Sequence, residues 1–168
     1  MVVLLVDAYN IIGAWPELKR LKAIDLAAAR DRLIDDMAEF QAYTGWRVIL
    51  VFDAHFVPGA ETRLKQSQVE IIYTRENETA DEKIEKFVSE LKDVRTTIYV
   101  ATSDSIEQWT VFSKGALRKP ARELYRDMEQ IKKRISTIIQ EYRQQNRRTT
   151  VALDDKLTAL FENWRRGK

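Results

Sequence analysis

Four short apolar runs, rich in β-branched residues, are the feature of this sequence that most restricts its fold. Each spans five or six residues, a length that suits a strand better than a helix. Runs that are largely apolar, rather than apolar at every second position, are typical of strands buried on both faces of a parallel sheet. The runs are VVLLV at 2–6, RVILVF at 47–52, VEIIY at 69–73 and TTIYVA at 96–101.

Segments with helical periodicity separate these runs. Between the first two runs, apolar residues recur three and four positions apart from Leu26 to Phe40, and the pattern stops at Gly45, a common helix terminator. A similar pattern extends from Ile84 to Leu91 before the fourth run. Strands that alternate with helices predict an α/β fold, here a three-layer domain around a central parallel sheet.

The last third of the chain carries a heptad seam. Apolar residues from Leu117 to Tyr142 follow one another at alternating spacings of four and three, which predicts one long helix. After a polar break at 144–150, a second apolar pattern over 153–164 predicts a short final helix. The seam can bury itself against the domain, pair with the final helix or pair with a second chain, so the oligomeric state stays open.

The chain, at 168 residues, suits one globular domain with a substantial core. We expect this domain at 1–128, with a helical extension at 129–168 that packs on it or projects from it. No apolar run approaches the roughly 20 residues that cross a bilayer, so no membrane partner is expected. The absence of cysteine excludes disulfides and thiolate metal sites, and it is compatible with the cytoplasmic location that we expect.

Three of the predicted strands are each followed by an aspartate. Asp7 follows the first run, Asp53 the second, and Asp104 lies just beyond the fourth. In an open parallel sheet the ligand crevice lies outside the C-terminal ends of the strands. These three carboxylates are therefore expected at one edge of the sheet.

A further pair of carboxylates comes from a predicted helix start. Thr79 and Glu82 have the S/T-x-x-E spacing of a capping box, which places Asp81 in the first helical turn. Taken singly, these aspartates also have structural explanations. Asp81 favours the positive end of the helix dipole, and Asp104 can cap the helix that follows it, with Glu107 three residues on.

As a set, the carboxylates point to a bound cation. Carboxylates that converge at one edge repel one another unless a cation lies among them. Oxygen ligands suit Mg²⁺ or Mn²⁺, and such ions promote phosphodiester cleavage. Asn10 can orient Asp7 or a water, or it can cap a turn after the first strand.

Other chemistries fit the sequence poorly. It contains neither a phosphate-binding P-loop nor a Gly-rich dinucleotide motif. The lone histidine, His55, and the lack of a nucleophile elbow argue against acyl-transfer triads. The first strand has no D-x-D motif of the kind used by aspartyl-phosphate phosphatases.

Charge is distributed unevenly along the chain. Residues 1–113 have 13 Lys and Arg against 19 Asp and Glu, whereas residues 114–168 have 15 against 7. An acidic body with a basic C-terminal region suits a protein that binds metal in one place and a polyanion in another. The same imbalance also has a simpler explanation in solubility.

A cluster of cations follows the Asp104 turn within KGALRKPAREL, residues 114–124. It can contact RNA phosphates, or it can form a solvated helix face that Pro120 opens. The nearby Trp109 and Phe112 can stack on unpaired bases, although the core is the more common place for such residues. The predicted RNA-binding residues are Lys114, Arg118, Lys119 and Arg122.

Five segments together resemble the NYN-domain endoribonucleases of the YacP-like family, part of the wider PIN-like nuclease group. These are VDAYNIIGAWPEL, VFDAH, ENETADEKIEKFV, VATSDSIEQW and GALRKPARELYRDM. The resemblance extends from residue 2 to about 128. It implies a PIN-like α/β fold and a divalent-metal site that cuts single-stranded RNA. Some members of the family act on messenger RNA on the ribosome, which implies mRNA as the substrate and the ribosome as a further partner.

We therefore predict an endoribonuclease that uses Mg²⁺ or Mn²⁺ to activate water. An RNA-binding or ribosome-docking adaptor that has lost catalysis is the alternative. A small phosphatase and a 5′-flap-type DNA nuclease are further candidates. By the resemblance, the catalytic residues are Asp7, Asn10, Asp81 and Asp104. The metal ligands are expected to be Asp7, Asp53, Asp81, Glu82 and Asp104.

Overall fold

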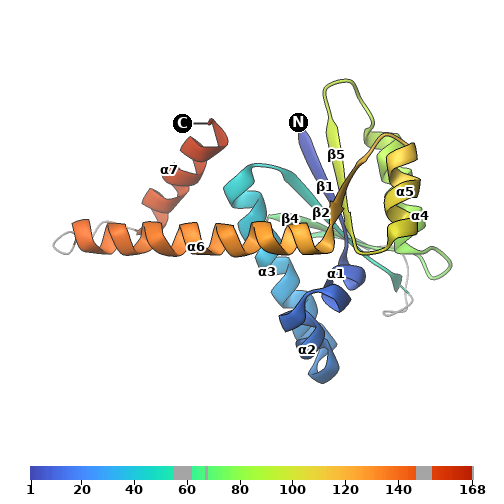
Figure 1. Cartoon of the computed structure of the whole chain (residues 1–168), viewed down its shortest axis with the longest axis horizontal. Coiled ribbons are helices and arrows are strands. Elements are labelled where there is room, and N and C mark those ends of the chain that lie inside the picture. Colours follow the sequence, from blue (N-terminus) through green and yellow to red (C-terminus); the bar gives the residue numbers. More distant parts are fainter. Residues whose placement is uncertain (55–61, 67, 147–152, 168) are drawn as a thin grey trace.

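The computed structural model describes residues 1–54, 62–66, 68–146 and 153–167. His55 and the cations Arg147 and Arg148 lie outside the described residues. The centre of the fold is a six-stranded sheet in the order β3-β4-β2-β1-β5-β6 (Figure 1). All four predicted strands are present and mutually parallel. They are β1 (Val2–Asp7), β2 (Arg47–Phe52), β4 (Val69–Tyr73) and β5 (Thr97–Thr102).

Two edge strands were not predicted. β3 (Thr62–Gln66) is antiparallel to β4, and its sequence TRLKQ lacks an apolar run. β6 (Leu117–Pro120) is parallel to β5. The prediction that Leu117 begins the long helix is therefore wrong. Pro120 has an extended ψ of 146°, so the helix starts only after it.

Helices cover both faces of the sheet and confirm the predicted three layers. Because side chains alternate along a strand, Leu4 and Val6 face one helical layer and Val3 and Leu5 face the other. The first layer contains α1 (Ala8–Ala14), α2 (Pro16–Ile24), α3 (Leu26–Thr44) and α6 (Ala121–Gln145). The second layer contains α4 (Ala80–Leu91) and α5 (Ser105–Ser113).

The predicted signals at two helix ends are confirmed. Gly45 ends α3 in the left-handed conformation, with φ 75°. The Thr79 side chain accepts a hydrogen bond from the backbone N–H of Glu82 and caps α4.

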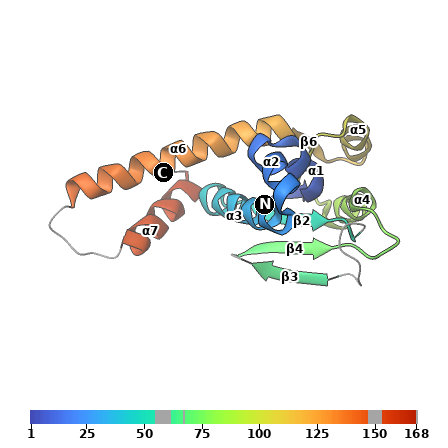
Figure 2. The ribbon, with the colours of Figure 1, turned by 90° about the horizontal axis from the view of Figure 1, so that it is seen from below.

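Helix α6 belongs to the domain at one end and projects from it at the other (Figures 1 and 2). Leu124, Met128 and Ile131 are buried in the core, so the predicted boundary after residue 128 falls inside one continuous helix. The final helix, α7 (Leu153–Arg165), returns to the body. There the ring of Trp164 lies 5.0 Å from that of Tyr43, centroid to centroid.

Within the described part of the chain, no helix combines the length and the apolar character that crossing a bilayer requires.

Two residues of the apolar seam, Leu124 and Leu117, should differ sharply in their contribution to stability. Leu124→Ala should lower the free energy of unfolding by about 2–5 kcal/mol, because the side chain is fully buried. Leu117→Ala, at a residue 41% exposed on β6, should cost less than about 1 kcal/mol. Urea unfolding of both variants measures the difference, and equal costs would contradict the placement of Leu117 outside the helix.

Candidate metal centre

The candidate centre lies where the sheet order reverses. Strand β1 pairs with β2 on one side and with β5 on the other, and ligand crevices of open parallel sheets form at such a switch point. Asp7 ends β1 in the same alternation as Val3 and Leu5, so its side chain points toward the layer of α4 and α5.

Each of the two facing helices contributes one further carboxylate. On α4, Asp81 continues the buried stripe of Ile84 and Val88, three and seven residues on. On α5, Glu107 lies one turn before the buried Val111. Both side chains therefore point toward the sheet and toward Asp7.

Carboxylate oxygens of Asp7, Asp81 and Glu107 lie within 4.8 Å of one another. We call these three residues the acidic cluster. Asp7 is 7% exposed and Glu107 is 3% exposed, while Asp81 is half-buried at the mouth of the cluster. Two predicted residues, Asp7 and Asp81, are thus brought together.

Burial raises the pKa of all three carboxyl groups, and the charge of a nearby carboxylate adds to the shift of each. Burial raises the pKa of Glu107 to about 10, and the charge of Asp7 adds to this effect. The pKa of Asp7 is raised to about 7, mainly by burial, while a hydrogen bond with Glu107 acts in the opposite direction. The pKa of Asp81 is also raised, first by burial. In the metal-free protein, Glu107 therefore holds a proton at neutral pH.

The cluster has the donor set of a divalent-cation site. Glu107 Oε1 is buried, and no described group hydrogen-bonds to it. No lysine or arginine among the described residues forms an ion pair with the three carboxylates. Buried carboxylates require a proton, a cationic side chain or a metal ion, and an oxygen-only donor set suits Mg²⁺ or Mn²⁺. The residues present therefore fit such an ion.

Glu107 was missed because its spacing from Asp104 predicted a role in capping. Asp104 does cap α5, since its Oδ1 accepts hydrogen bonds from the backbone N–H groups of Ile106 at 2.9 Å and Glu107 at 3.4 Å. In a capping box the Glu107 carboxylate would accept a hydrogen bond from the Asp104 N–H in return. Here the Thr102 hydroxyl accepts that hydrogen bond, at 3.1 Å. The same hydroxyl donates to Glu107 Oε2 at 2.8 Å. This leaves the Glu107 carboxyl in the acidic cluster. The one signal in the sequence was its i, i+4 spacing to Val111.

The structure places the other predicted ligands around the cluster. Asp104 caps α5, yet its charge is near enough to raise the pKa of Asp81. Asp53 Oδ2 accepts a hydrogen bond from the backbone N–H of Ala80 at 3.3 Å and so positions the start of α4. Glu82 is exposed and lies outside the acidic cluster.

Asn10 connects α1 to the junction between β5 and α5. Its Oδ1 accepts hydrogen bonds from the backbone N–H of Ser103 at 2.5 Å and from the Ser103 hydroxyl at 2.6 Å. The amide oxygen therefore fixes the loop that carries Asp104. An orienting role toward water remains a prediction.

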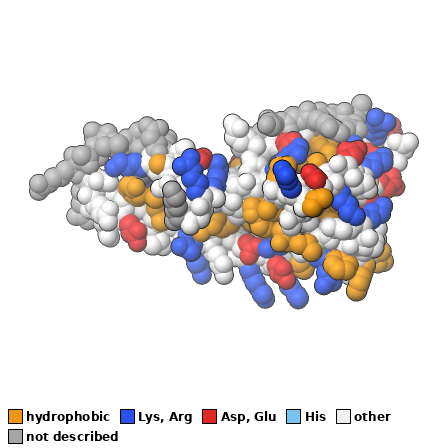
Figure 3. Space-filling model, turned by 90° about the horizontal axis from the view of Figure 1, so that it is seen from above, with side chains coloured by type: hydrophobic (Ala, Val, Ile, Leu, Met, Phe, Trp, Pro, Cys, Tyr) orange, Lys and Arg blue, Asp and Glu red, His pale blue; other side chains and the backbone are white. Residues whose placement is uncertain are grey.

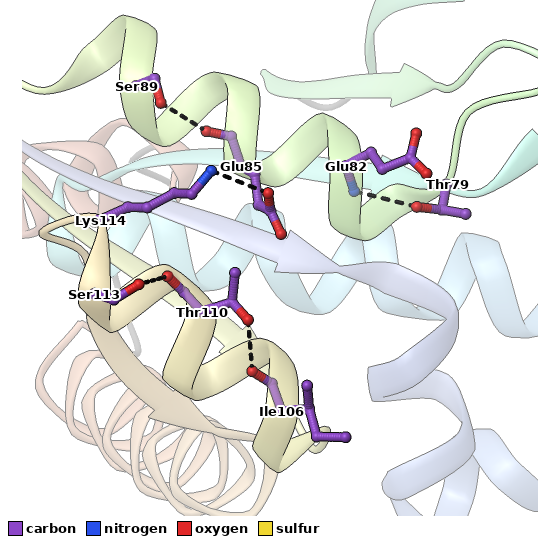
Figure 4. A network of polar contacts seen from close by, with 8 residues as sticks. All are labelled: Thr79, Glu82, Glu85, Ser89, Ile106, Thr110, Ser113 and Lys114. Atoms are coloured by element: carbon purple, nitrogen blue, oxygen red, sulfur yellow. Dashed lines mark hydrogen bonds and ion pairs between the residues drawn. The ribbon is translucent and has the colours of Figure 1, made fainter.

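The predicted RNA-binding cations do not form one strip. Figure 4 shows Lys114 reaching from the end of α5 to Glu85 on α4, where its Nζ lies 3.1 Å from Oε2. Arg118 and Lys119 are consecutive in β6 and point to opposite faces. Arg118 lies over the Trp109 ring at 5.7 Å, whereas Lys119 forms an ion pair with Asp127 on α6. Arg122 is exposed in the first turn of α6.

The expectation that Trp109 and Phe112 pack in the core is wrong. Trp109 is 64% exposed and Phe112 is 51% exposed, because α5 buries the opposite face, which carries Glu107 and Val111. Hydrophobic side chains do lie at the surface of the end of the molecule that carries α4 and α5 (Figure 3). Their exposure leaves both rings accessible for the predicted stacking on bases.

The chain belongs to the YacP-like NYN domain family, whose pattern matches residues 4–166, and this family has a nuclease-type fold. The match includes the C-terminal helices, beyond the segments on which the resemblance rested.

The chain is also similar to particular members of the family. It is 53% identical to a protein of Bacillus subtilis (strain 168) described as uncharacterized protein YacP, over 99% of this chain and 98% of that protein. The crystal structure of Rae1 (YacP) from B. subtilis matches with a TM-score of 0.79 and 53% identity. Its W164L mutant matches with a TM-score of 0.80 and 50% identity. Each comparison covers 99% of this chain and 96% of the solved one.

Cation affinity should increase with pH. The pKa of Asp7 is about 7 and that of Glu107 about 10, so protons must leave before the carboxylates bind a metal ion. Binding of Mn²⁺ should therefore tighten by at least about tenfold between about pH 6 and pH 8. Titration calorimetry in two buffers of different ionisation enthalpy measures both the affinity and the released protons. Equal affinity at both pH values would contradict this arrangement.

Glu107→Gln should stabilise the metal-free protein. The pKa of the Glu107 carboxyl is higher in the folded protein than in the unfolded chain. Its contribution to stability is therefore fully present below the unfolded-state pKa, and it is lost as the pH rises toward the folded-state pKa. Near pH 8 the substitution should therefore raise the free energy of unfolding by on the order of 1 kcal/mol. Urea unfolding with chelator measures this gain, and unfolding with Mn²⁺ should show that stabilisation by the ion is lost. Glu90→Gln, at an exposed position near the end of α4, is the matched control.

Proposed function

We propose that this protein is a divalent-cation-dependent endoribonuclease that cleaves single-stranded RNA, with mRNA as the expected substrate. The observation that carries this proposal is the acidic cluster at the switch point of a nuclease-type sheet, because its buried carboxylates have no cationic side chain among the described residues as a partner and favour a bound cation. Hydrolysis of the phosphodiester should leave 5′-phosphate and 3′-hydroxyl ends.

Each residue of the centre has a distinct task in this proposal. Asp7, Asp81 and Glu107 would hold the ion, with Asp104 close enough to add negative charge. A bound Mg²⁺ or Mn²⁺ lowers the pKa of water and stabilises charge that develops on the phosphate. Thr102 orients the Glu107 carboxyl through its hydroxyl, and Asp53 holds the first turn of α4, which carries Asp81.

Ribosome docking without catalysis is the second candidate function. The observation that favours it is the projecting part of α6, which carries the exposed cations Lys133, Arg134 and Arg143. Purified protein should be tested on single-stranded RNA, single-stranded DNA and a phosphomonoester, with Mg²⁺ and with chelator. An adaptor would sediment with ribosomes but cleave none of these substrates. A nuclease of the proposed kind cleaves only the RNA, and only with Mg²⁺.

Asp81→Asn should abolish RNA cleavage and preserve the fold. The amide loses the negative charge that would hold the ion, and the half-buried side chain keeps its size. Cleavage of a labelled single-stranded RNA should fall by at least about 100-fold, with an unchanged circular dichroism spectrum. Asp93→Asn, at an exposed position after α4, should cleave like the unaltered protein. Full activity of Asp81→Asn would remove this residue from the proposed centre.

Trp109→Ala should weaken binding of single-stranded RNA by about tenfold, since a base that stacks on an exposed ring contributes about 1–3 kcal/mol. The positive charge of Arg118 over this ring suits the adjacent phosphate. Fluorescence anisotropy with a labelled oligonucleotide measures the affinity. Ile24→Ala removes another exposed apolar side chain, 85% exposed at the end of α2, and serves as the control. The same affinity in both variants would exclude stacking on Trp109.

A further inference from the structure

A cavity of about 510 Å³ opens between helices α1, α2, α5 and α6, in a position that no predicted site residue except Arg122 had indicated. Its volume falls within the range of about 300–1,000 Å³ that is usual for small-molecule sites. Segments far apart in the sequence meet there. The residues on which the argument rests are Trp15, Ser103, Gln108, Pro120, Arg122 and Tyr125.

The aromatic wall of this cavity is held in a fixed orientation. Trp15 Nε1 donates a hydrogen bond to the carbonyl oxygen of Ala121 at 2.9 Å. The rings of Trp15 and Tyr125 meet edge to face, with centroids 5.6 Å apart. The Tyr125 hydroxyl donates to the carboxylate of Glu17 at 2.8 Å. Rings that are fixed in advance lose little conformational freedom when a flat ligand packs against them.

The polar groups of the cavity suit a nucleotide. The Gln108 side chain is held in place, because its Nε2 donates to the carbonyl oxygen of Thr102 at 3.0 Å, and amide side chains recognise the edges of bases. Arg122 is exposed at the start of α6, where its guanidinium can pair with a phosphate. An aromatic wall combined with an amide and a cation matches one base with its phosphate.

The cavity and the acidic cluster share one piece of backbone, the junction between β5 and α5. The Thr102 hydroxyl binds Glu107 of the cluster, while the Thr102 carbonyl oxygen binds Gln108 of the cavity. Ser103 lines the cavity and also holds Asn10, which lies three residues after Asp7. An RNA strand whose phosphate lies at the acidic cluster can therefore extend a neighbouring nucleotide toward the cavity.

We propose that this cavity is a nucleobase-binding subsite that holds an unpaired base next to the scissile phosphate. The inference rests on the proposed function, because it assigns the cavity to the same RNA strand. The subsite requires a single-stranded substrate, since a base inside a duplex cannot leave its stack to enter the cavity without breaking a pair.

The test measures affinity with chelator present, so that no strand is cut. A labelled single-stranded RNA is compared with a series in which one abasic nucleotide is moved along the strand. Tyr125→Leu removes the ring and should bind the intact RNA about tenfold more weakly. Tyr125→Phe keeps the ring and should restore the affinity. Tyr142→Leu, farther along α6 and away from the cavity, is the matched control and should bind like the unaltered protein.

The abasic series makes the assignment specific. At one position, loss of the base should weaken binding to the unaltered protein about tenfold but should cost Tyr125→Leu nothing further. Ala14→Trp places a large side chain at the exposed rim of the cavity, and loss of the base at that position should likewise cost this variant nothing further. This second variant keeps the test informative if Tyr125→Leu unfolds. Equal abasic penalties in the unaltered protein and in either folded variant would overturn the subsite.

A parallel cleavage assay with Mg²⁺ separates this inference from the proposed function. Protein that shows the position-specific abasic effect but never cuts RNA would support the subsite and overturn the nuclease. Protein that cuts RNA with no such effect would overturn the subsite alone. Failure to bind RNA at all would overturn the subsite as well.

Discussion

The mutual repulsion of three carboxylates at the C-terminal end of strand β1 is the constraint on which the site depends. Asp7, Asp81 and Glu107 lie within 4.8 Å of one another, and two of them are almost fully buried. Such an arrangement costs free energy in the absence of a cation, as the raised pKa values show. The apolar layers on both faces of the sheet offset that cost, because they fix the strand and the two helices that carry the three side chains. The fold thus holds together three carboxylates that favour the binding of a cation.

Hydrogen bonds at the ends of strands and helices keep the site in register. Thr102 links the β5 terminus to both Asp104 and Glu107, and Asp53 links the end of β2 to the start of α4. Asn10 joins α1 to Ser103 across the switch point. Each of these three side chains accepts a hydrogen bond from a backbone N–H group at the end of a strand or helix, where regular structure leaves such groups without partners. Of the predicted site residues, Asp7 and Asp81 therefore belong to the acidic cluster, and Asn10, Asp53 and Asp104 hold the segments around it. Glu82 does neither.

Much of the architecture could be predicted because its signals are local. The apolar runs identified four strands, Gly45 marked the end of α3, and Thr79 with Glu82 marked the start of α4. The signals failed where a neighbour in space overruled the local pattern. Leu117 fits the heptad spacing, but pairing with Tyr99 of β5 draws it into a strand. Trp109 is apolar, yet α5 turns a different face toward the sheet.

The sequence by itself determined the four inner strands of the sheet and the gathering of aspartates at one edge of it, because hydrophobic periodicity is a property of short stretches of chain. Only the tertiary structure decided which carboxylates meet. Glu107 joins Asp7 because the packing of α5 fixes its rotation about its own axis, while Glu82 points to solvent from the same turn of α4 that directs Asp81 inward. The cavity beside Ser103 likewise exists only where four helices converge. The contacts between Asp7 and Glu107 and between Trp15 and Ala121 join residues about a hundred positions apart. Local sequence patterns do not predict contacts between residues so far apart in the chain.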